Sequence, residues 1–246
     1  MHALFHLGRF AEGELVLQEA LPLARSVGNR WLVGYLLRLF GSASASVGDI
    51  VAARGYIAEA LQNYEAVDAN LSIAWAMGAS GLVEFRAGNT ELALRHATDA
   101  LVIFRAFSSA RAVVITLNSM AMYLVSLARC AEAEKRAHEA LDLARAHHLD
   151  VHVANALQHL AAVATFRPRS AEERWPTVCV QSARVLGFID ARLAAMGSGR
   201  EDGEQHEYDR ALAVLREALG ANAVAKLITE GAALTEEQAV EEALTI

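Results

Sequence analysis

The sequence has few residues that interrupt helices or cross-link a chain. Only three prolines and two cysteines occur among its 246 residues, and 54% of all residues are apolar. Alanine and leucine dominate, while the alternation of apolar and polar residues that is typical of strands is scarce. The shortage of proline therefore favours long helices. Cys130 and Cys179 lie far apart in the sequence, and no signal peptide is recognised in it. Both observations predict reduced thiols in a cytoplasmic protein.

A long apolar run and an excess of basic residues are also missing. The longest uncharged run, residues 112–128, is just short of the roughly 18 to 20 residues of a membrane span and contains Thr116 and Asn118. It therefore predicts a buried helix and no membrane contact. From Ser198 onward the chain has 11 acidic and 4 basic residues, whereas residues 1–197 are neutral overall. Because phosphate binding needs concentrated basic charge, this region is not expected to bind nucleic acid.

What the sequence does contain is a repeat of 40 residues. The tetrapeptides "QEAL", "AEAL", "TDAL" and "HEAL" end at Leu21, Leu61, Leu101 and Leu141. Other positions keep the same spacing without any insertion, as internal repeats require. These positions are Gly8, Gly48, Gly88 and Ala128; Gly13, Ala53, Ala93 and Ala133; and Val33, Ile73, Val113 and Val153.

Each unit contains two segments with helical spacing. Residues 71–87 are an example of the first kind of segment and residues 90–106 of the second, which has an apolar stripe every three to four residues. A small residue recurs in the first segment, at Gly41, Gly81, Ala121 and Ala161. Glycine inside a helix costs about 1 kcal/mol relative to alanine, so we expect two helix backbones to approach closely here.

These small residues, the tight glycine turn and the closing Ala-Leu pair resemble the tetratricopeptide repeat, in a lengthened form. The 40-residue unit is similar to helical domains of large bacterial regulators of the maltose-activator type and of ATPase- or cyclase-linked proteins. The stretches "SARVLGFIDARLAAMG" and "YDRALAVLREALG" extend the resemblance toward the C-terminus. It implies an all-α fold, an α-solenoid of antiparallel helix pairs that forms a right-handed superhelix with a C-terminal helical cap.

The resemblance and the spacing together predict the domain organisation. Residues 1–166 form the repeat array, with a partial first unit that leaves apolar residues such as Leu15, Leu17 and Leu21 partly uncovered and open to self-association. An interrupting loop at 167–176 follows, with Ser170 and Glu173 as a capping box. Residues 177–246 form a divergent last repeat and an acidic cap, including a flexible loop at 197–204 and a capping box of Thr235 and Gln238. The units lie near 8–47, 48–87, 88–127 and 128–166.

Motifs of catalysis are not found in the sequence. It has no phosphate loop, zinc-protease motif or nucleophile elbow, so we expect no enzyme, no catalytic residue and no cofactor. His138 and His147 point to opposite sides of their helix and cannot share a metal ion. By alignment His138 is expected to be exposed, His147 to pack near a helix end, and His148 to occupy a turn. His148, His152 and His159 stay an alternative metal cluster, although no metal site is expected.

The resemblance also places one side of the first helices in a concave groove. Side chains suited to a peptide backbone, a carboxylate or an apolar anchor lie on that side. They are Tyr35, Arg38, Trp75, Phe85, Arg86, Asn118, Met122, Asn155 and Gln158. The sequence therefore predicts a non-catalytic scaffold for a protein or peptide partner, or for an upstream domain of the same polypeptide. The alternative is a sensor that holds a small-molecule effector between the groove and the C-terminal cap.

Overall fold

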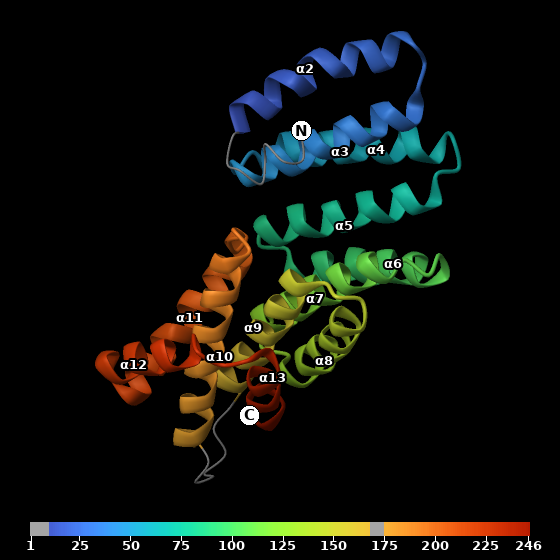
Figure 1. Cartoon of the computed structure of the whole chain (residues 1–246). Helices are drawn as coiled ribbons and strands as arrows, with labels where there is room; N and C mark the ends of the chain where they lie inside the picture. Colours follow the sequence, from blue (N-terminus) through green and yellow to red (C-terminus); the bar gives the residue numbers. More distant parts are fainter. Residues whose placement is uncertain (1–9, 168–174) are drawn as a thin grey trace. The chain divides into compact units, whose positions relative to one another are not determined.

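The chain is helical in every regular element of the part that the structure describes. The computed structural model describes residues 10–167 and 175–246, which form twelve helices and no strand, so the predicted all-α fold is confirmed. Figure 1 shows the helices along the chain. Their bounds are α2 Phe10–Ser26, α3 Arg30–Ser46, α4 Ile50–Glu65, α5 Asn70–Arg86, α6 Thr90–Ala106, α7 Ala110–Ser126, α8 Cys130–Ala146, α9 Asp150–Phe166, α10 Trp175–Ala195, α11 Asp202–Leu219, α12 Ala221–Gly231 and α13 Glu236–Thr245.

The helix bounds follow the 40-residue spacing. The first helices of the units, α3, α5, α7 and α9, begin at Arg30, Asn70, Ala110 and Asp150. Their partners α4, α6 and α8 begin at Ile50, Thr90 and Cys130. The segment expected at 90–106 is confirmed at both ends, and the one expected at 71–87 begins and ends one residue earlier. The handedness of a superhelix stays a prediction.

A residue in the left-handed conformation follows most of the repeat helices. At the first type of turn these residues are Gly48, Gly88 and Ala128, with φ of 85°, 82° and 56°. At the second type they are Gly28, Asp68, Ser108 and His148. After His148, the Leu149 N–H donates to the Ala144 carbonyl at 2.9 Å, which closes the end of α8. The predicted turn position of His148 is therefore confirmed.

The chain divides into two compact units, with the boundary between Ser109 and Ala110. In unit 1, helices that are neighbours in sequence from α2 to α6 pack against each other (Figure 1). Leu17, Leu37 and Tyr64 are completely buried in its core. A Cβ atom on Gly41 would lie 2.6 Å from the Ile57 side chain and 3.2 Å from the main-chain carbonyl oxygen of Ala53 on α4. The expected close approach is confirmed for Gly41.

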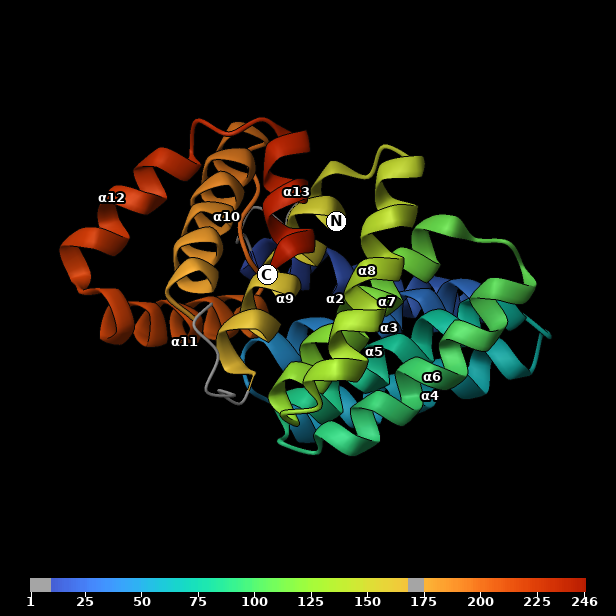
Figure 2. The ribbon, with the colours of Figure 1, turned by 90° about the horizontal axis from the view of Figure 1, so that it is seen from below.

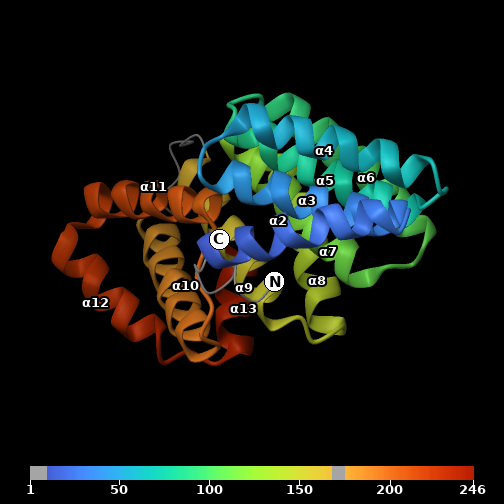
Figure 3. The ribbon, with the colours of Figure 1, turned by 90° about the horizontal axis from the view of Figure 1, so that it is seen from above.

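In unit 2, α7, α8 and α9 pack in the manner of the repeat, and α10 packs on α9. Helices α10, α11 and α12 contact one another pairwise, and α13 lies beside α10 and α9 (Figures 2 and 3). Two glycines make the crossing of α10 and α12 close. A Cβ atom on Gly187 would collide with the Ile228 backbone, and one on Gly231 with the Arg184 backbone.

Helix α7 carries the long uncharged run of the sequence and is buried along most of its length, as predicted. None of the helices within the described ranges is both long and apolar enough to span a membrane. Both cysteines are buried free thiols.

Four expectations at the ends of the array need correction or qualification. The loop predicted at 197–204 is shorter, because Glu201 and Glu204 form a capping box and α11 begins at Asp202. Leu17 and Leu21 pack against α3 and are buried, whereas Leu15 is 62% exposed. His147 is exposed, so the prediction that it packs is wrong. The capping box predicted at Ser170 and Glu173 lies outside the described residues, while that of Thr235 and Gln238 is confirmed.

The turns provide a stability test with opposite expected signs. Gly88→Ala should lower the free energy of unfolding by about 1 kcal/mol, because a Cβ atom is strained at positive φ. A methyl group at Gly88 would meet no neighbouring atom, so packing does not enter the comparison. Ala128→Gly, at the equivalent turn, should raise the free energy by a similar amount. Urea unfolding followed by circular dichroism measures both, and two changes of the same sign would contradict the assignment.

The crossing of α10 and α12 gives a second test. Gly187→Ala should destabilise the protein by about 1 to 3 kcal/mol, because the methyl group has no space beside the Ile228 backbone. Gly55→Ala is the matched control, since Gly55 lies on the exposed side of α4 with no atom near its Cβ position. The control should stabilise by about 1 kcal/mol through helix propensity. Thermal or urea unfolding of both variants distinguishes a tight crossing from a general effect of alanine.

Candidate functional site

An aromatic surface lies on α3 and α5 of unit 1. We name it the aromatic face and define it by Trp31, Tyr35, Arg38, Ser72 and Trp75. The rings of Trp31 and Tyr35 are stacked with centroids 5.6 Å apart, and the Arg38 guanidinium lies 5.6 Å from the Tyr35 ring centroid. The Trp31 indole N–H donates to Ser72 Oγ at 2.9 Å, which joins the two helices. Trp31 stays 47% exposed despite these contacts.

The aromatic face has no free carboxylate on its own helices. Helix α3 contains no acidic residue, and Glu84 is the single acidic residue of α5. Both carboxylate oxygens of Glu84 accept hydrogen bonds from Arg54 of α4, each at 2.7 Å. The hydrogen bond from Arg54 is the main reason why the pKa of Glu84 is lowered. The negative charge of Glu84 is thus paired with Arg54, and Arg38 is the charged residue of the aromatic face.

Exposed apolar side chains are concentrated in unit 1. Among the described residues, ten of the eleven large apolar side chains that are exposed lie between Leu15 and Phe107. Three of them, Val27, Val67 and Phe107, occupy the same position of successive units, at the turn after the second helix. Trp31 and Leu71 also share one repeat position. Exposed apolar side chains are therefore more frequent in unit 1 than in unit 2 among the described residues.

Unit 2 contains instead a polar cluster between α9 and α11, in which Gln158, His159 and Glu207 are buried and Asn155 and Glu204 are half-buried. Asn155 Nδ2 donates to Glu204 Oε1 at 2.6 Å, and Gln158 Nε2 donates to the Glu204 carbonyl at 2.8 Å. His159 Nδ1 lies 2.8 Å from Glu207 Oε1, with 1% and 4% of the two side chains exposed. We name these five residues the α9–α11 cluster. Glu207 Oε2 is buried and accepts no hydrogen bond in the described structure.

The segment between α10 and α11 extends the cluster toward α10. Arg200 Nε donates to Gln158 Oε1 at 2.6 Å, and its Nη2 lies 2.6 Å from Asp190 Oδ1 without hydrogen-bond geometry. The Arg200 guanidinium also covers the Tyr208 ring, 3.8 Å from the centroid. Tyr208 donates its hydroxyl proton to Asp190 Oδ2 at 2.6 Å. Arg200 therefore connects α9, α10 and α11.

Burial and charge shift the titration of this cluster. Burial is the main reason why the pKa of Glu204 rises from 4.5 to about 7. Burial alone would lower the pKa of His159, but the charge and hydrogen bond of Glu207, with the charge of Glu204, outweigh it and raise the pKa. Burial, followed by the hydrogen bond to Asp190, raises the pKa of Tyr208. Glu204, His159 and Tyr208 therefore hold their protons more tightly than the same groups in water.

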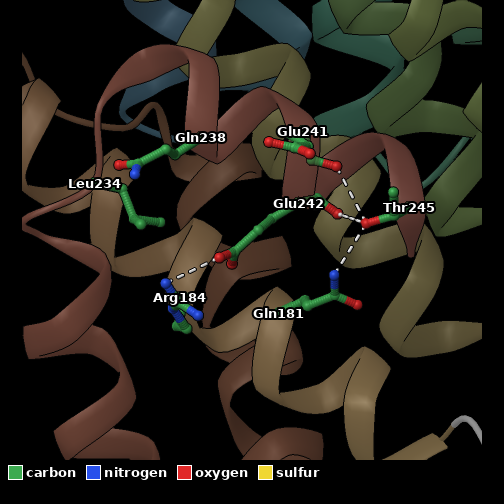
Figure 4. A pocket seen from close by; sticks show the side chains of 7 residues that line it. All are labelled: Gln181, Arg184, Leu234, Gln238, Glu241, Glu242 and Thr245. Carbon is green, nitrogen blue, oxygen red and sulfur yellow. Dashed lines mark hydrogen bonds and ion pairs between the residues drawn. The ribbon is translucent and has the colours of Figure 1, made fainter.

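A separate pocket of about 320 Å³ lies between α10 and α13 in unit 2. Figure 4 shows its lining, in which Arg184 Nη2 pairs with Glu242 Oε1 at 3.0 Å and Gln181 Nε2 donates to Thr245 Oγ1 at 2.9 Å. Burial raises the pKa of Glu242. The lining is polar apart from Leu234, and several of its groups already bond to each other. The complete lining is Gln181, Arg184, Leu234, Gln238, Glu241, Glu242 and Thr245.

The residues predicted to line a groove fall into both units. In unit 1, Tyr35, Arg38 and Trp75 belong to the aromatic face, and Trp75 also packs on Phe104 with ring centroids 4.9 Å apart. Arg86 donates from Nη1 to the Ala45 carbonyl at 2.8 Å, which holds the end of α5 to α3. Phe85 is half-buried.

In unit 2 the predicted residues face other parts of the protein. Asn118 and Met122 of α7 are buried, and Asn118 Nδ2 donates to the His152 carbonyl at 3.1 Å. Asn155 and Gln158 are held by α11. The structure thus shows direct contacts of the protein with itself for Asn118, Asn155 and Gln158, and their binding of a partner stays a prediction.

The histidines occupy three different environments. His148 lies in a turn, His152 is half-buried, and His159 pairs with Glu207. His138 is half-buried, so its predicted exposure is only partial. Within residues 10–167 and 175–246, no group of three histidine, cysteine or acidic side chains is arranged to hold a metal ion.

Sequence reasoning missed the acidic half of the α9–α11 cluster. Glu204 and Glu207 are three residues apart and share one helix face, but they lie in a segment that was predicted to be partly loop. The capping box of Glu201 and Glu204 was the signal that could have placed the start of α11.

Comparison with known proteins gives no assignment. No protein-family model matches the chain, and a search of curated proteins finds no significant match.

The α9–α11 cluster leads to a stability prediction. His159→Ala should destabilise the protein by about 3 to 5 kcal/mol, because it leaves the buried Glu207 carboxylate without its partner. His206→Ala, on the exposed side of α11, should change stability by less than about 0.5 kcal/mol. Urea unfolding measures both variants. A small effect of His159→Ala would mean that the pair is not closed in solution.

Proposed function

We propose that the chain is a non-catalytic scaffold that binds a protein or peptide segment through the aromatic face of unit 1. The observation that carries this proposal is the ring of Trp31, which is 47% exposed and stacked on Tyr35, with the Arg38 guanidinium beside them. Tryptophan, tyrosine and arginine dominate the energetics of protein interfaces. Trp31, Tyr35 and Arg38 present all three types along one side of α3.

The mechanism is binding to a preformed surface. The stacking of Trp31 on Tyr35 and the hydrogen bond from Trp31 to Ser72 fix the rings before a partner arrives. Ordering a free side chain on binding costs about 0.5 to 1.5 kcal/mol, so preordered rings keep more of their contact energy. The Arg38 guanidinium offers hydrogen bonds to a carbonyl or carboxylate. No bond-making step is involved.

The resemblance to helical domains of bacterial regulators supports a wider context for this proposal. In the proposed context this scaffold acts in the cytoplasm and couples the binding of a partner to an output domain of the same polypeptide. Self-association through α2 is part of the proposal, because Leu15 and Leu23 are 62% and 67% exposed on that helix.

A small-molecule effector is the second candidate function, and the pocket between α10 and α13 is the observation that favours it, although its lining lies wholly within residues 177–246 and not between the predicted groove and the cap. A thermal-shift screen of metabolites tests it, since a ligand at 100 times its Kd adds about 2.7 kcal/mol of stability. Stabilisation that is lost in Arg184→Gln would support the pocket as the site.

The peptide-binding proposal is tested with a displayed library of random peptides selected on the wild-type chain. Peptides that are selected should bind Trp31→Ala at least about tenfold more weakly, because an interface hot spot contributes 2 kcal/mol or more. Val51→Ala is the matched control, since Val51 is 82% exposed on α4 and lies outside the aromatic face.

Fluorescence anisotropy with labelled peptides gives both affinities, and circular dichroism verifies that helical content is unchanged. Selected peptides that bind the wild type and Trp31→Ala with equal affinity would contradict the proposal.

A further inference from the structure

The first turns of α11 occupy the polar side of α9 in the way that a bound peptide would. The Gln158 side chain donates to the main-chain carbonyl of Glu204, and Asn155 donates to its carboxylate. His159 pairs with the Glu207 carboxylate one turn further along α11. Side-chain amides that bind both a backbone carbonyl and a carboxylate are the contacts expected of a peptide-binding surface. Here the protein supplies the occupant itself.

Ionisable groups from several elements meet at this contact. Helix α9 contributes His159, α10 contributes Asp190, the connecting segment contributes Arg200 and Glu201, and α11 contributes Glu204, Glu207 and Tyr208. Helix α7 has one charged residue, Arg111, whose charge acts on His152. On α12, Lys226 and Glu230 pair with each other, 3.6 Å apart.

We propose that α11 is a proton-controlled cover over the polar side of α9, docking more tightly as the pH falls and loosening as it rises. The geometry gives the reason. At the start of α11 the Glu201 N–H donates to Glu204 Oε2 at 3.1 Å, and His159 Nδ1 of α9 lies 2.8 Å from Glu207 Oε1 one turn further along. A proton added to Glu204 removes repulsion between carboxylates, and a proton added to His159 strengthens its pair with the Glu207 carboxylate.

The direction of the effect is the same for both titrating groups. The pKa of Glu204 is raised to about 7 in the docked state, mainly by burial, and that of His159 is also raised, because the Glu207 carboxylate outweighs burial. Docking therefore binds protons. A group whose pKa is raised on docking contributes stability below its free pKa and loses it as the pH rises through the docked value. For Glu204 this window extends from about pH 4.5 to about pH 7.

This inference goes beyond the proposed function, which uses the aromatic face of unit 1. Release of α11 would uncover Asn155, Gln158 and His159 on α9. Their polar side would then be open to another segment with carboxylates three residues apart on a helix, in the pattern of Glu204 and Glu207. Acidification would close this second surface without changing the first.

Hydrogen exchange of the full chain tests the proposal. Amide protection in residues 202–219 is measured by mass spectrometry at about pH 6 and about pH 8.5 and corrected for the intrinsic exchange rate. The shift of Glu204 predicts about tenfold greater protection of α11 at the lower pH. Helix α8 in the same unit is the internal reference. Equal changes in α8 and α11 would overturn the proposal, because they would report the stability of the whole unit.

A matched pair of variants isolates the titrating group. Glu204→Gln imitates the protonated side chain, so its α11 should stay protected at about pH 8.5 and lose the part of the pH dependence that Glu204 contributes, while the part from His159 stays. Glu217→Gln removes a carboxylate from the exposed side of the same helix and should behave as wild type. The same response in both variants would overturn the assignment to Glu204. If Glu204→Gln does not fold, the comparison of α8 with α11 in the wild type decides alone.

Discussion

The constraint on which the repeat depends is the reversal of direction between consecutive helices. Each reversal takes about three residues, and most of them place one residue at positive φ, as at Gly28, Gly48 and Gly88. Where the residue is Ala128 or His148, the left-handed conformation costs roughly 1 to 2 kcal/mol. The cost is tolerated because the turn brings an Ala- and Leu-rich face of each helix onto its neighbour. Helix length, spacing and core all follow from this turn.

The two units differ in the polar groups that they bury. Among the described residues of unit 1, Glu84 is the one buried charged side chain and pairs with Arg54, whereas α9 buries Gln158 and His159 at 2% and 1% exposure. Buried charges and amides are stable only with hydrogen-bond or ion-pair partners. The polar side chains of α9 therefore depend on Glu204, Glu207 and Arg200, and these three residues depend on α9 in turn. The close crossing of α10 and α12 at Gly187 and Gly231 packs α12 tightly on α10, which α11 also contacts. The close packing of α12 on α10 and the ion pairs and hydrogen bonds between α9 and α11 thus together hold the C-terminal helices of unit 2 in place.

Local features were predictable from the sequence, and contacts between distant segments were not. The helices at 90–106 and the Thr235 capping box follow from residues within one or two turns of each other, so pattern alone located them. The start of α11 was misplaced because glycines at 197–203 masked the capping box at Glu201. The contact of Gln158 with Glu204 joins residues 46 positions apart, and no periodicity reports it. Burial of Leu17 was missed because the cover that α3 provides could not be seen in the pattern.

Equivalent positions of the repeat have different surroundings in the two units, and this difference bears on function. The position of Tyr35 and Trp75 holds rings in unit 1, with Tyr35 stacked beside an exposed tryptophan, whereas Asn155 at the same position bonds to α11. The position of Arg38 is taken by Gln158, which is also bound by α11 and Arg200. A repeat with identical units would present one surface throughout. Here unit 1 keeps the side chains at these positions half-buried on α3 and α5, while unit 2 pairs them with other parts of its own chain, so the proposed binding at the two is expected to obey different controls.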